Sequence, residues 1–412
     1  MRIAPHPLIF DWNDDAAGAN RVAMLDDETL RDGLQSPSVR HPSIDEKIGI
    51  LHHMAALGID TADIGLPGAG PKVAKDVERL ARAIGEARLK ISANCAARTM
   101  IGDIKPIAEI QQRTGVAIEC CAFIGSSPIR QYAEGWSIEF LQKCTDDALT
   151  FAAKEGLTTM YVTEDTTRAD PNSLKVLYTT AIRAGVKRVC VADTVGHATA
   201  HGAKAVVRYV KSIIDELGVA VGIDWHGHRD RGFGVASSIA ALEAGATRLH
   251  GAALGIGERC GNTPIDLLMV NLAMMGYIDR DLTKLPAYCR AVARACDVRI
   301  APNYPVIGAD AFRTATGVHA AAVVKAFHKG DRALMDAVYA AVPASMVGRE
   351  QEIEVGPMSG RSNVVFWLEK RGLPATDEIV DRVFAAAKAS NRTLTHDQIQ
   401  TIIDDTKLRA IS

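Results

Sequence analysis

The sequence predicts an α/β fold in which eight parallel strands alternate with helices, followed by a mostly helical C-terminal region. Short β-rich runs recur along the first two-thirds of the 412 residues, and each is followed by a longer stretch with apolar residues at helical spacing. Several of these stretches end in glycine, as in "AAKEGLT" and "LEAGATR", which is a common helix stop. Eight such units in about 260 residues fit a closed (β/α)8 TIM barrel. The alternative, an open doubly wound sheet, would carry a glycine fingerprint after the first strand, and "MLDDETLRDG" is not one.

The expected elements of the barrel follow in a regular order within residues 1–285. The strands are expected at Arg21–Leu25, Thr61–Leu66, Leu89–Asn94, Val116–Phe123, Thr159–Thr163, Arg188–Ala192, Val221–Trp225 and Arg248–Ala253. The helices between them are expected at Ile44–Gly58, Pro71–Glu86, Ser137–Gly156, Pro171–Gly185, His201–Gly218 and Phe233–Gly245.

The alternation stops near residue 285, so residues 286–412 are expected to form a separate C-terminal helical region. Its first part contains Pro302, Pro305 and Gly308, a composition typical of a linker. The expected helices are Ala287–Cys296, Ala320–Phe327, Leu334–Ala341, Ser362–Arg371, Asp377–Ser390 and Asp397–Asp405.

Composition excludes several classes of protein. The formal net charge of -2 gives no basic field for nucleic acid. No apolar run approaches the roughly 18 residues of a membrane span, and the N-terminus lacks the pattern of a signal peptide. The eight cysteines contain no CxxC pair, which favours free thiols in a reducing cytoplasm.

Polar clusters follow five of the expected strands. They read "DETLRDG", "TEDTTR", "ADTVGHAT", "HGHRD" and "LGIGERCGNTP" in chain order. Each one alone has an ordinary structural explanation, such as a surface ion pair, a helix cap or a tight turn. In a TIM barrel, however, the groups that do chemistry follow the strands at the C-terminal face. Five clusters at the same end of five strands therefore indicate one active site.

The stretch "WHGHRDRGFG" contains the strongest signal for a metal. His226 and His228 are two residues apart, so in a strand they point to one face, roughly 6–7 Å apart. Asp32 would approach from the first strand, which neighbours the eighth in a closed barrel. Two imidazoles and one carboxylate leave coordination positions open, as in a catalytic site. Such a site accepts zinc, manganese, cobalt or iron, and magnesium less readily.

Together these clusters resemble the Claisen-condensing acyl-CoA enzymes: the 2-isopropylmalate, homocitrate and citramalate synthases. The likeness continues through "FRTATGVHAAAVVKA" and "MVGREQEIEVGPMSGRSN" and covers about residues 22 to 370. The resemblance implies that acetyl-CoA and a 2-keto acid condense to a substituted malate and CoA. It also implies a divalent metal, zinc, manganese, cobalt or magnesium, and a homodimer.

The resemblance also implies roles for individual residues. Asp32, His226 and His228 would hold the metal. Arg31 would stabilise oxyanion charge, Glu164 would orient the substrate or relay a proton, and His319 would enter the neighbouring subunit's active site. The expected substrate-binding residues are Gln35, Met160, Arg168, Thr194, Gly257 and Asn262, with Asn262 also a candidate for a fourth or near metal ligand.

The choice of keto acid depends on departures from the family pattern. Homocitrate synthases have an arginine where this chain has Met160, which favours an apolar keto acid such as 2-oxoisovalerate, because a buried carboxylate without a cation is costly. Arg98 or Arg229 could still supply a charge, so homocitrate formation stays open. Citramalate formation is a further alternative, and because methionine is adaptable, so is benzylmalate formation. Arg229 replaces a common Asn, and Gln351 replaces a Tyr of some members. The sequence stops at Ser412, before any leucine-sensing domain, so no leucine feedback is expected.

Two alternatives come from other classes. A 3-hydroxy-acyl-CoA lyase would use the same metal triad and a cysteine in the last glycine loop, where this chain has Cys260, although "GERCGNTP" follows the synthase pattern. A barrel retained as a non-enzymatic scaffold would have lost some of Arg31, Asp32, His226 and His228, and none is lost.

Overall fold

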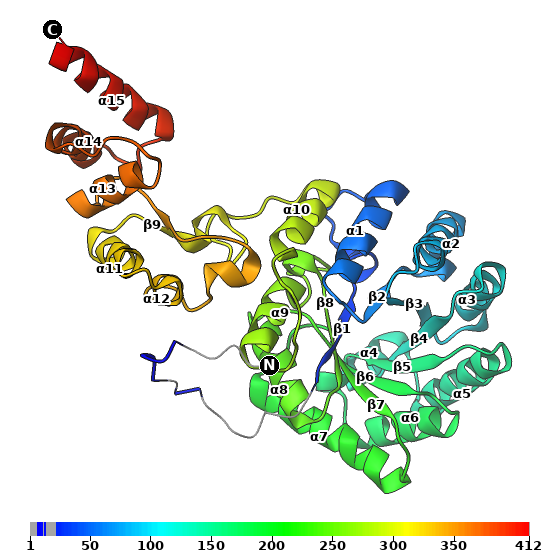
Figure 1. Cartoon of the computed structure of the whole chain (residues 1–412). Helices are drawn as coiled ribbons and strands as arrows, with labels where there is room; N and C mark the ends of the chain where they lie inside the picture. The colour runs from blue at the N-terminus through cyan, green and yellow to red at the C-terminus, as the bar shows by residue number, and fades with distance from the viewer. Residues whose placement is uncertain (1–5, 11, 14–21, 412) are drawn as a thin grey trace. The chain divides into compact units, whose positions relative to one another are not determined.

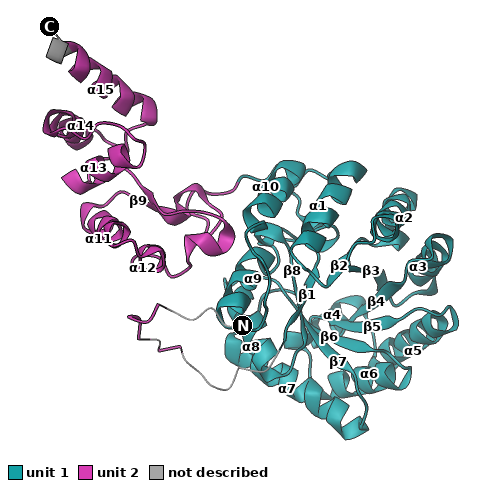
Figure 2. Ribbon diagram, viewed as in Figure 1, with its two compact units in different colours: residues 1–3, 15–299 teal, residues 4–14, 300–412 magenta. Residues whose placement is uncertain are grey.

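The computed structural model describes residues 6–10, 12–13 and 22–411. The chain divides into two compact units; of the described residues, 22–299 form unit 1, and 6–10, 12–13 and 300–411 form unit 2 (Figure 2). Arg21, the first residue of the first predicted strand, lies outside the described residues.

Unit 1 is a closed barrel of parallel strands in chain order, with β1 pairing β8 to complete the ring. The predicted TIM barrel is thus confirmed. The strands are β1 (Met24–Asp27), β2 (Thr61–Asp63), β3 (Ser92–Arg98), β4 (Ile118–Gly125), β5 (Thr159–Glu164), β6 (Arg188–Asp193), β7 (Gly222–Gly227) and β8 (Arg248–Gly251).

Helices surround the strands on the outside of the barrel (Figure 1). They are α1 (Ile44–Ala56), α2 (Pro71–Glu86), α3 (Ile101–Thr114), α4 (Pro128–Glu134), α5 (Ile138–Lys154), α6 (Pro171–Arg183), α7 (Ala200–Leu217), α8 (Gly234–Ala244), α9 (Ile265–Met274) and α10 (Leu285–Cys296). Helix α1 begins with a capping box, in which Ser43 Oγ accepts from Glu46 N and the Glu46 carboxylate accepts from Ser43 N. Gly218, in the left-handed conformation, ends α7.

The sequence did not predict α3, α4 or α9. Helix α3 contains Pro106 in its second turn and Gly102 in its first, two residues that lower helix propensity. Its buried side chains Ile104, Ile107 and Ile110 show that packing against the barrel outweighs this local preference.

The boundary between the units lies one helix later than residue 285. Helix α10 belongs to unit 1 because its apolar face, including Leu285, Cys289 and Val292, is buried. Tyr288 of α10 also donates a 2.5 Å hydrogen bond to Oδ2 of Asp27 at the end of β1. Because this helix completes the wall around β1, it is part of the barrel rather than of the C-terminal region.

Unit 2 is mostly helical. Its helices are α11 (Gly317–His328), α12 (Arg332–Ala337), α13 (Arg361–Glu369), α14 (Asp377–Ala389) and α15 (His396–Ile411), and a short parallel pair joins β9 (Arg313–Thr314) to β10 (Glu352–Ile353). The larger of two apolar clusters packs around Val364, Trp367 and Val383. Among the described residues, no helix is both long and apolar enough to cross a membrane.

The interior of the barrel is charged as well as apolar. Asp224 on β7 pairs with Arg188 and with Arg248, and Arg248 also donates to Glu119 at 2.6 Å. Asp224 and Arg248 are buried. The carboxylates and guanidinium groups in this layer are therefore paired and hydrogen-bonded with one another, as buried charges require.

Candidate active site

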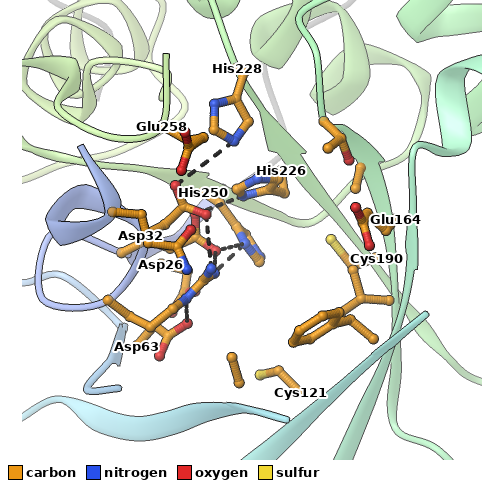
Figure 3. A pocket seen from close by; sticks show the side chains of 18 of the residues that line it. Asp26, Asp32, Asp63, Cys121, Glu164, Cys190, His226, His228, His250 and Glu258 are labelled. Atoms are coloured by element: carbon orange, nitrogen blue, oxygen red, sulfur yellow. Dashed lines mark hydrogen bonds and ion pairs between the residues drawn. The ribbon is translucent and has the colours of Figure 1, made fainter. Parts of the chain in front are cut away.

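A cavity of about 380 Å³ lies among the C-terminal ends of the barrel strands. Its histidines and most of its acids lie on one side, facing Glu164, Cys190 and Cys121 on the other (Figure 3). Eight residues expected from the sequence line it: Arg31, Asp32, Gln35, Met160, Glu164, Thr194, His226 and His228.

Asp32, His226 and His228 meet as the sequence predicted. One ligand atom from each lies within 4.8 Å of the others. His226 and His228 lie at the end of β7 with ring centroids 5.1 Å apart, and Nε2 of His228 is 3.8 Å from Oδ1 of Asp32. Asp32 begins a short 3₁₀ turn five residues after the last residue of β1. The three side chains therefore converge from the first and seventh strands.

Two of the three residues, His228 and Asp32, have the protonation state that suits a cation, whereas for His226 burial is outweighed by the Glu28 carboxylate, which raises the pKa of that imidazole. Burial, with His226 beside it, lowers the pKa of His228, which favours the neutral imidazole. Burial opposes ionisation of Asp32, but the Arg31 guanidinium outweighs it, so the pKa of Asp32 is lowered. A neutral imidazole and an ionised carboxylate are the forms that bind a metal.

Glu28, His226 and His250 form a second group with ligand atoms close together. Both ring nitrogens of His250 already face carboxylates, with Nδ1 3.0 Å from Glu28 Oε1 and Nε2 2.8 Å from Asp224 Oδ2. Burial disfavours its cation, yet the surrounding Asp26, Glu28 and Asp224 raise the pKa of His250 to about 10. A protonated imidazole is not a metal ligand, so the Asp32 triad fits a metal better.

Arg31 is held at the pocket by three carboxylates. Its Nε donates to Asp63 at 2.6 Å, and its two other nitrogens donate to Asp32 at 2.8 Å and to Glu28 at 3.1 Å. The planar guanidinium is therefore fixed beside the candidate metal ligands Asp32, His226 and His228. A fixed cation there can stabilise negative charge that develops on a bound substrate.

Gly257 and Asn262 of the glycine loop after β8 support Asp32, whereas Glu258 and Arg259 of the same loop line the cavity. Asn262 is buried and donates from Nδ2 to Oδ1 of Asp32 at 2.8 Å. Gly257 has φ +145°, and a Cβ there would lie 2.3 Å from Asn262 Nδ2. In the described part of the chain, the cavity lining includes neither residue.

Other expected residues also lie away from the lining. Arg168 folds back onto buried Asp165, donating from Nε at 2.8 Å and from a terminal nitrogen at 2.7 Å. His319 is exposed on α11 in unit 2, where its ring stacks on Tyr339 at 4.3 Å. Cys260, the cysteine of the glycine loop, is exposed and is not among the described residues that line the cavity.

Arg229 and Gln351, which depart from the family pattern, and Arg98, the other possible source of charge, occupy the following positions. Arg229 braces the glycine loop, donating to the carbonyl oxygen of Cys260 at 2.8 Å. Gln351 is buried in unit 2. Arg98 pairs with Asp103 at 2.7 Å. In the described part of the chain neither Arg98 nor Arg229 lines the cavity.

One wall of the cavity is apolar. Met160 and Val162 of β5 pack with Cys121 of β4 and Cys190 of β6. The wall comprises Ala96, Cys121, Phe123, Met160, Val162, Cys190 and Ala192.

Arg130 and Glu164 border this wall. Burial raises the pKa of the Glu164 carboxyl, and the charge of Arg130 opposes that shift. Nε of Arg130 is buried and forms no hydrogen bond within the described residues.

Sequence reasoning missed Glu28, Asp63, Arg130 and His250. A signal for two of them was present, because alternate residues of a strand share a face. Glu28 lies two residues after Asp26, just past the end of β1, and His250 lies two residues after Arg248 in β8, so each pair points into the barrel.

Comparison with known proteins agrees with this fold. The HMGL-like family profile matches residues 22–292. The chain is 31% identical to the homocitrate synthase AksA of Methanopyrus kandleri, over 88% of this chain and 86% of that protein. It is 30% identical to a 2-isopropylmalate synthase of Pyrococcus furiosus, over 93% of this chain and 76% of that protein.

A solved structure agrees at the level of the fold. The hydroxymethylglutaryl-CoA lyase of Pseudomonas aeruginosa superimposes with a TM-score of 0.55 at 19% identity, covering 68% of this chain and 94% of that one. Since the family profile spans the whole barrel and the similarity to the synthases extends into unit 2, the chain belongs to the HMGL-like family.

Proposed function

We propose that this chain is an alkylmalate synthase that condenses acetyl-CoA with a 2-keto acid bearing an apolar side chain. The observation that supports this most is the shared cavity. The metal triad and Arg31 line it together with a wall of apolar side chains. The cavity thus has a charged part suited to a keto-carboxylate and an apolar part suited to its side chain.

The charged part fits the reacting group. A divalent cation held by Asp32, His226 and His228 would polarise the ketone and absorb the negative charge that builds on its oxygen. Thr194 Oγ1 accepts a 2.8 Å hydrogen bond from Asp165 N, which leaves the hydroxyl proton free to donate to the substrate carboxylate. Arg31 supplies a second positive charge beside the triad.

The proposed reaction has two stages, a condensation and a hydrolysis. The methyl group of acetyl-CoA gives up a proton, and its carbon forms a bond to the ketone carbon, whose oxygen takes a proton to become a hydroxyl. Water then attacks the thioester, and the C–S bond breaks. The products are a 2-substituted malate and the free thiol of CoA.

The apolar part decides the choice of substrate. Met160 is 2% exposed, and its Sδ lies 3.3 Å from a terminal nitrogen of Arg248. That arginine is already paired with Asp224 and Glu119, so its charge is compensated. A second carboxylate placed against Met160 would lose its hydration without gaining a partner.

A dicarboxylic keto acid, as in homocitrate formation, is the second candidate because of Arg130. Its Nε forms no hydrogen bond among the described residues, although a terminal nitrogen pairs with Glu134 at 3.0 Å. A distal carboxylate that reached Arg130 rather than Met160 would be partnered. We favour the apolar side chain because Met160 and its neighbours form the wall.

We further propose that the chain acts as a homodimer in which His319 enters the neighbouring subunit's cavity. Its exposure on α11 leaves the imidazole available to a partner. The reaction itself is tested with acetyl-CoA carrying a carbon-13 methyl group. The label should appear in the methylene carbon of a substituted malate only when a keto acid and a divalent metal are present. Cleavage of 3-hydroxy-3-methylglutaryl-CoA, without any labelled malate, would instead identify a lyase.

A further inference from the structure

Glu28 is a buried carboxylate that contacts both the metal triad and Arg31. It is 3% exposed, directly after β1. Its Oε2 lies 2.7 Å from Nδ1 of His226. Its Oε1 lies 3.0 Å from Nδ1 of His250 and 3.1 Å from a terminal nitrogen of Arg31. Both oxygens of one carboxylate are therefore occupied by three neighbours that donate.

The contact with Glu28 decides which nitrogen of His226 is available. A carboxylate only accepts hydrogen bonds, so Nδ1 carries a proton, and in the neutral imidazole it carries the only one. Nε2 of His226 then carries the lone pair that the triad needs. A histidine that donates its other N–H to a carboxylate is also a more basic and better oriented ligand.

Glu28 is itself held by residues deeper in the barrel. Nε2 of His250 faces Asp224 at 2.8 Å, and Asp224 pairs in turn with Arg188 and Arg248. These residues come from β6, β7 and β8. The chain of contacts from His226 through Glu28 and His250 to Asp224 thus anchors one metal ligand in the rigid interior of the barrel.

The second histidine has no such support. Nδ1 of His228 is buried and has no hydrogen-bond partner among the described residues. The two imidazoles of the triad therefore differ in how firmly they are oriented, although they lie two residues apart, His226 in β7 and His228 just after it.

We infer that Glu28 is a positioning residue, which fixes the tautomer and orientation of His226 and thereby sets the affinity of the triad for a divalent metal. This inference concerns metal binding at the site of the proposed function. It is tested without either substrate, so its outcome is independent of the reaction catalysed.

The test measures the dissociation constant for Mn²⁺ by electron paramagnetic resonance of the free ion. Three proteins are compared: wild type, Glu28→Gln and Glu119→Gln. Glutamine offers a single acceptor oxygen to the three donors, so Glu28→Gln should weaken Mn²⁺ binding about 10- to 100-fold. Glu119 is the matched control, because it is an interior carboxylate that pairs with Arg248 and is not in contact with the triad. Glu119→Gln should stay within about twofold of wild type.

Thermal unfolding of the metal-free proteins separates positioning from general weakening of the barrel. We expect similar losses of Tm in the two variants and a loss of Mn²⁺ affinity in Glu28→Gln alone. Unchanged affinity in Glu28→Gln, or an equal loss in both variants, would overturn the inference. A wild type that binds Mn²⁺ but releases no CoA would refute the proposed function and leave this inference intact.

A spectroscopic measurement examines the tautomer directly. In long-range ¹H–¹⁵N spectra of histidine-labelled protein without metal, His226 of the wild type should show a protonated Nδ1. Its signals are assigned by comparison with His226→Asn. Glu28→Gln should shift His226 toward a mixture of tautomers, and the same Nδ1-protonated form in both proteins would contradict the role of Glu28.

Discussion

Asn262 donates a hydrogen bond of 2.8 Å from Nδ2 to Oδ1 of Asp32, although 230 positions separate the two residues in the chain. They meet because β1 and β8 are neighbours in the closed barrel, which brings the turn after the first strand against the loop after the last. The contact orients the carboxylate of Asp32, a proposed metal ligand, and it depends on the absence of a side chain at Gly257.

Gly257→Ala should therefore weaken metal binding. The new Cβ would lie 2.3 Å from Asn262 Nδ2 and 3.2 Å from Asp32 Oδ1, so both side chains must move. We expect about a 10-fold rise in the Mn²⁺ dissociation constant. Gly156→Ala is the control, because Gly156 also has positive φ but a Cβ added there would meet nothing within 4 Å. Equal effects of both substitutions would assign the loss to backbone strain alone.

Arg31→Lys should slow the reaction. Lysine is a point charge and cannot keep the three hydrogen bonds to Asp63, Asp32 and Glu28. We expect kcat to fall by about 10²–10³, the usual cost of losing one group that stabilises an oxyanion. The control is Arg280→Lys, which alters a partly buried ion pair with Asp60. Wild-type kcat in Arg31→Lys would remove Arg31 from the mechanism.

Met160→Ala should change which keto acid is preferred. Shortening this side chain enlarges the apolar end of the cavity. The ratio of kcat/KM for 4-methyl-2-oxopentanoate to that for 2-oxoisovalerate should rise about 10-fold, since one methylene in an apolar pocket changes discrimination by about 1–3 kcal/mol. Met54→Ala is the control, because Met54 is a buried methionine of α1. An unchanged ratio in Met160→Ala would show that the substrate side chain binds elsewhere.

The raised pKa of Glu164 should determine how kcat/KM falls at acidic pH. Burial raises the pKa of this carboxyl above its ordinary 4.5, with Arg130 opposing. If the ionised form orients the substrate or relays a proton, kcat/KM is highest above this raised pKa and falls as the pH drops through it. Glu164→Gln should have a lower kcat/KM and lack that acidic fall. The same acidic limb in Glu164→Gln would assign it to another group.

Complementation tests the role of His319. Asp32→Ala and His319→Ala should each be nearly inactive when expressed alone. If His319 acts in the neighbouring subunit, a mixed dimer has one intact site, so co-expression of the two variants in equal amounts should restore about a quarter of wild-type activity. Size-exclusion chromatography establishes the dimer first. No recovery in verified mixed dimers would show that His319 does not act across subunits.

Much of the barrel could be predicted because the spacing of apolar residues differs between a strand and a helix and can be recognised locally in the sequence. Helix α3 could not, because Pro106 and Gly102 argue against a helix locally and only packing against the barrel compensates. Likewise, the local sequence of α10 does not show that this helix belongs to the barrel. The hydrogen bond from Tyr288 to Asp27, 261 positions earlier, could not be predicted from it.

The convergence of Asp32, His226 and His228 could be predicted because these residues follow strands, and the position of a strand end is fixed by the fold. Two other expected residues do not line the cavity because of how their turns are built. Arg168 turns back onto Asp165, which has φ +61° just after β5, and Gly257 makes room for Asn262. Such turn geometry depends on neighbours from other strands, which a single sequence does not specify.

The metal-dependent condensation is tested most directly by the release of CoA thiol from acetyl-CoA, followed with a thiol-reactive dye after chelator treatment, with and without added Mn²⁺. The keto acids are 2-oxoisovalerate, pyruvate, 2-oxoglutarate, 4-methyl-2-oxopentanoate and phenylpyruvate, and Asp32→Asn is the matched control. We predict release that requires both Mn²⁺ and an apolar keto acid and is lost in Asp32→Asn. Preference for 2-oxoglutarate would contradict the role of Met160, and release by the metal-free protein or by Asp32→Asn would contradict the metal triad.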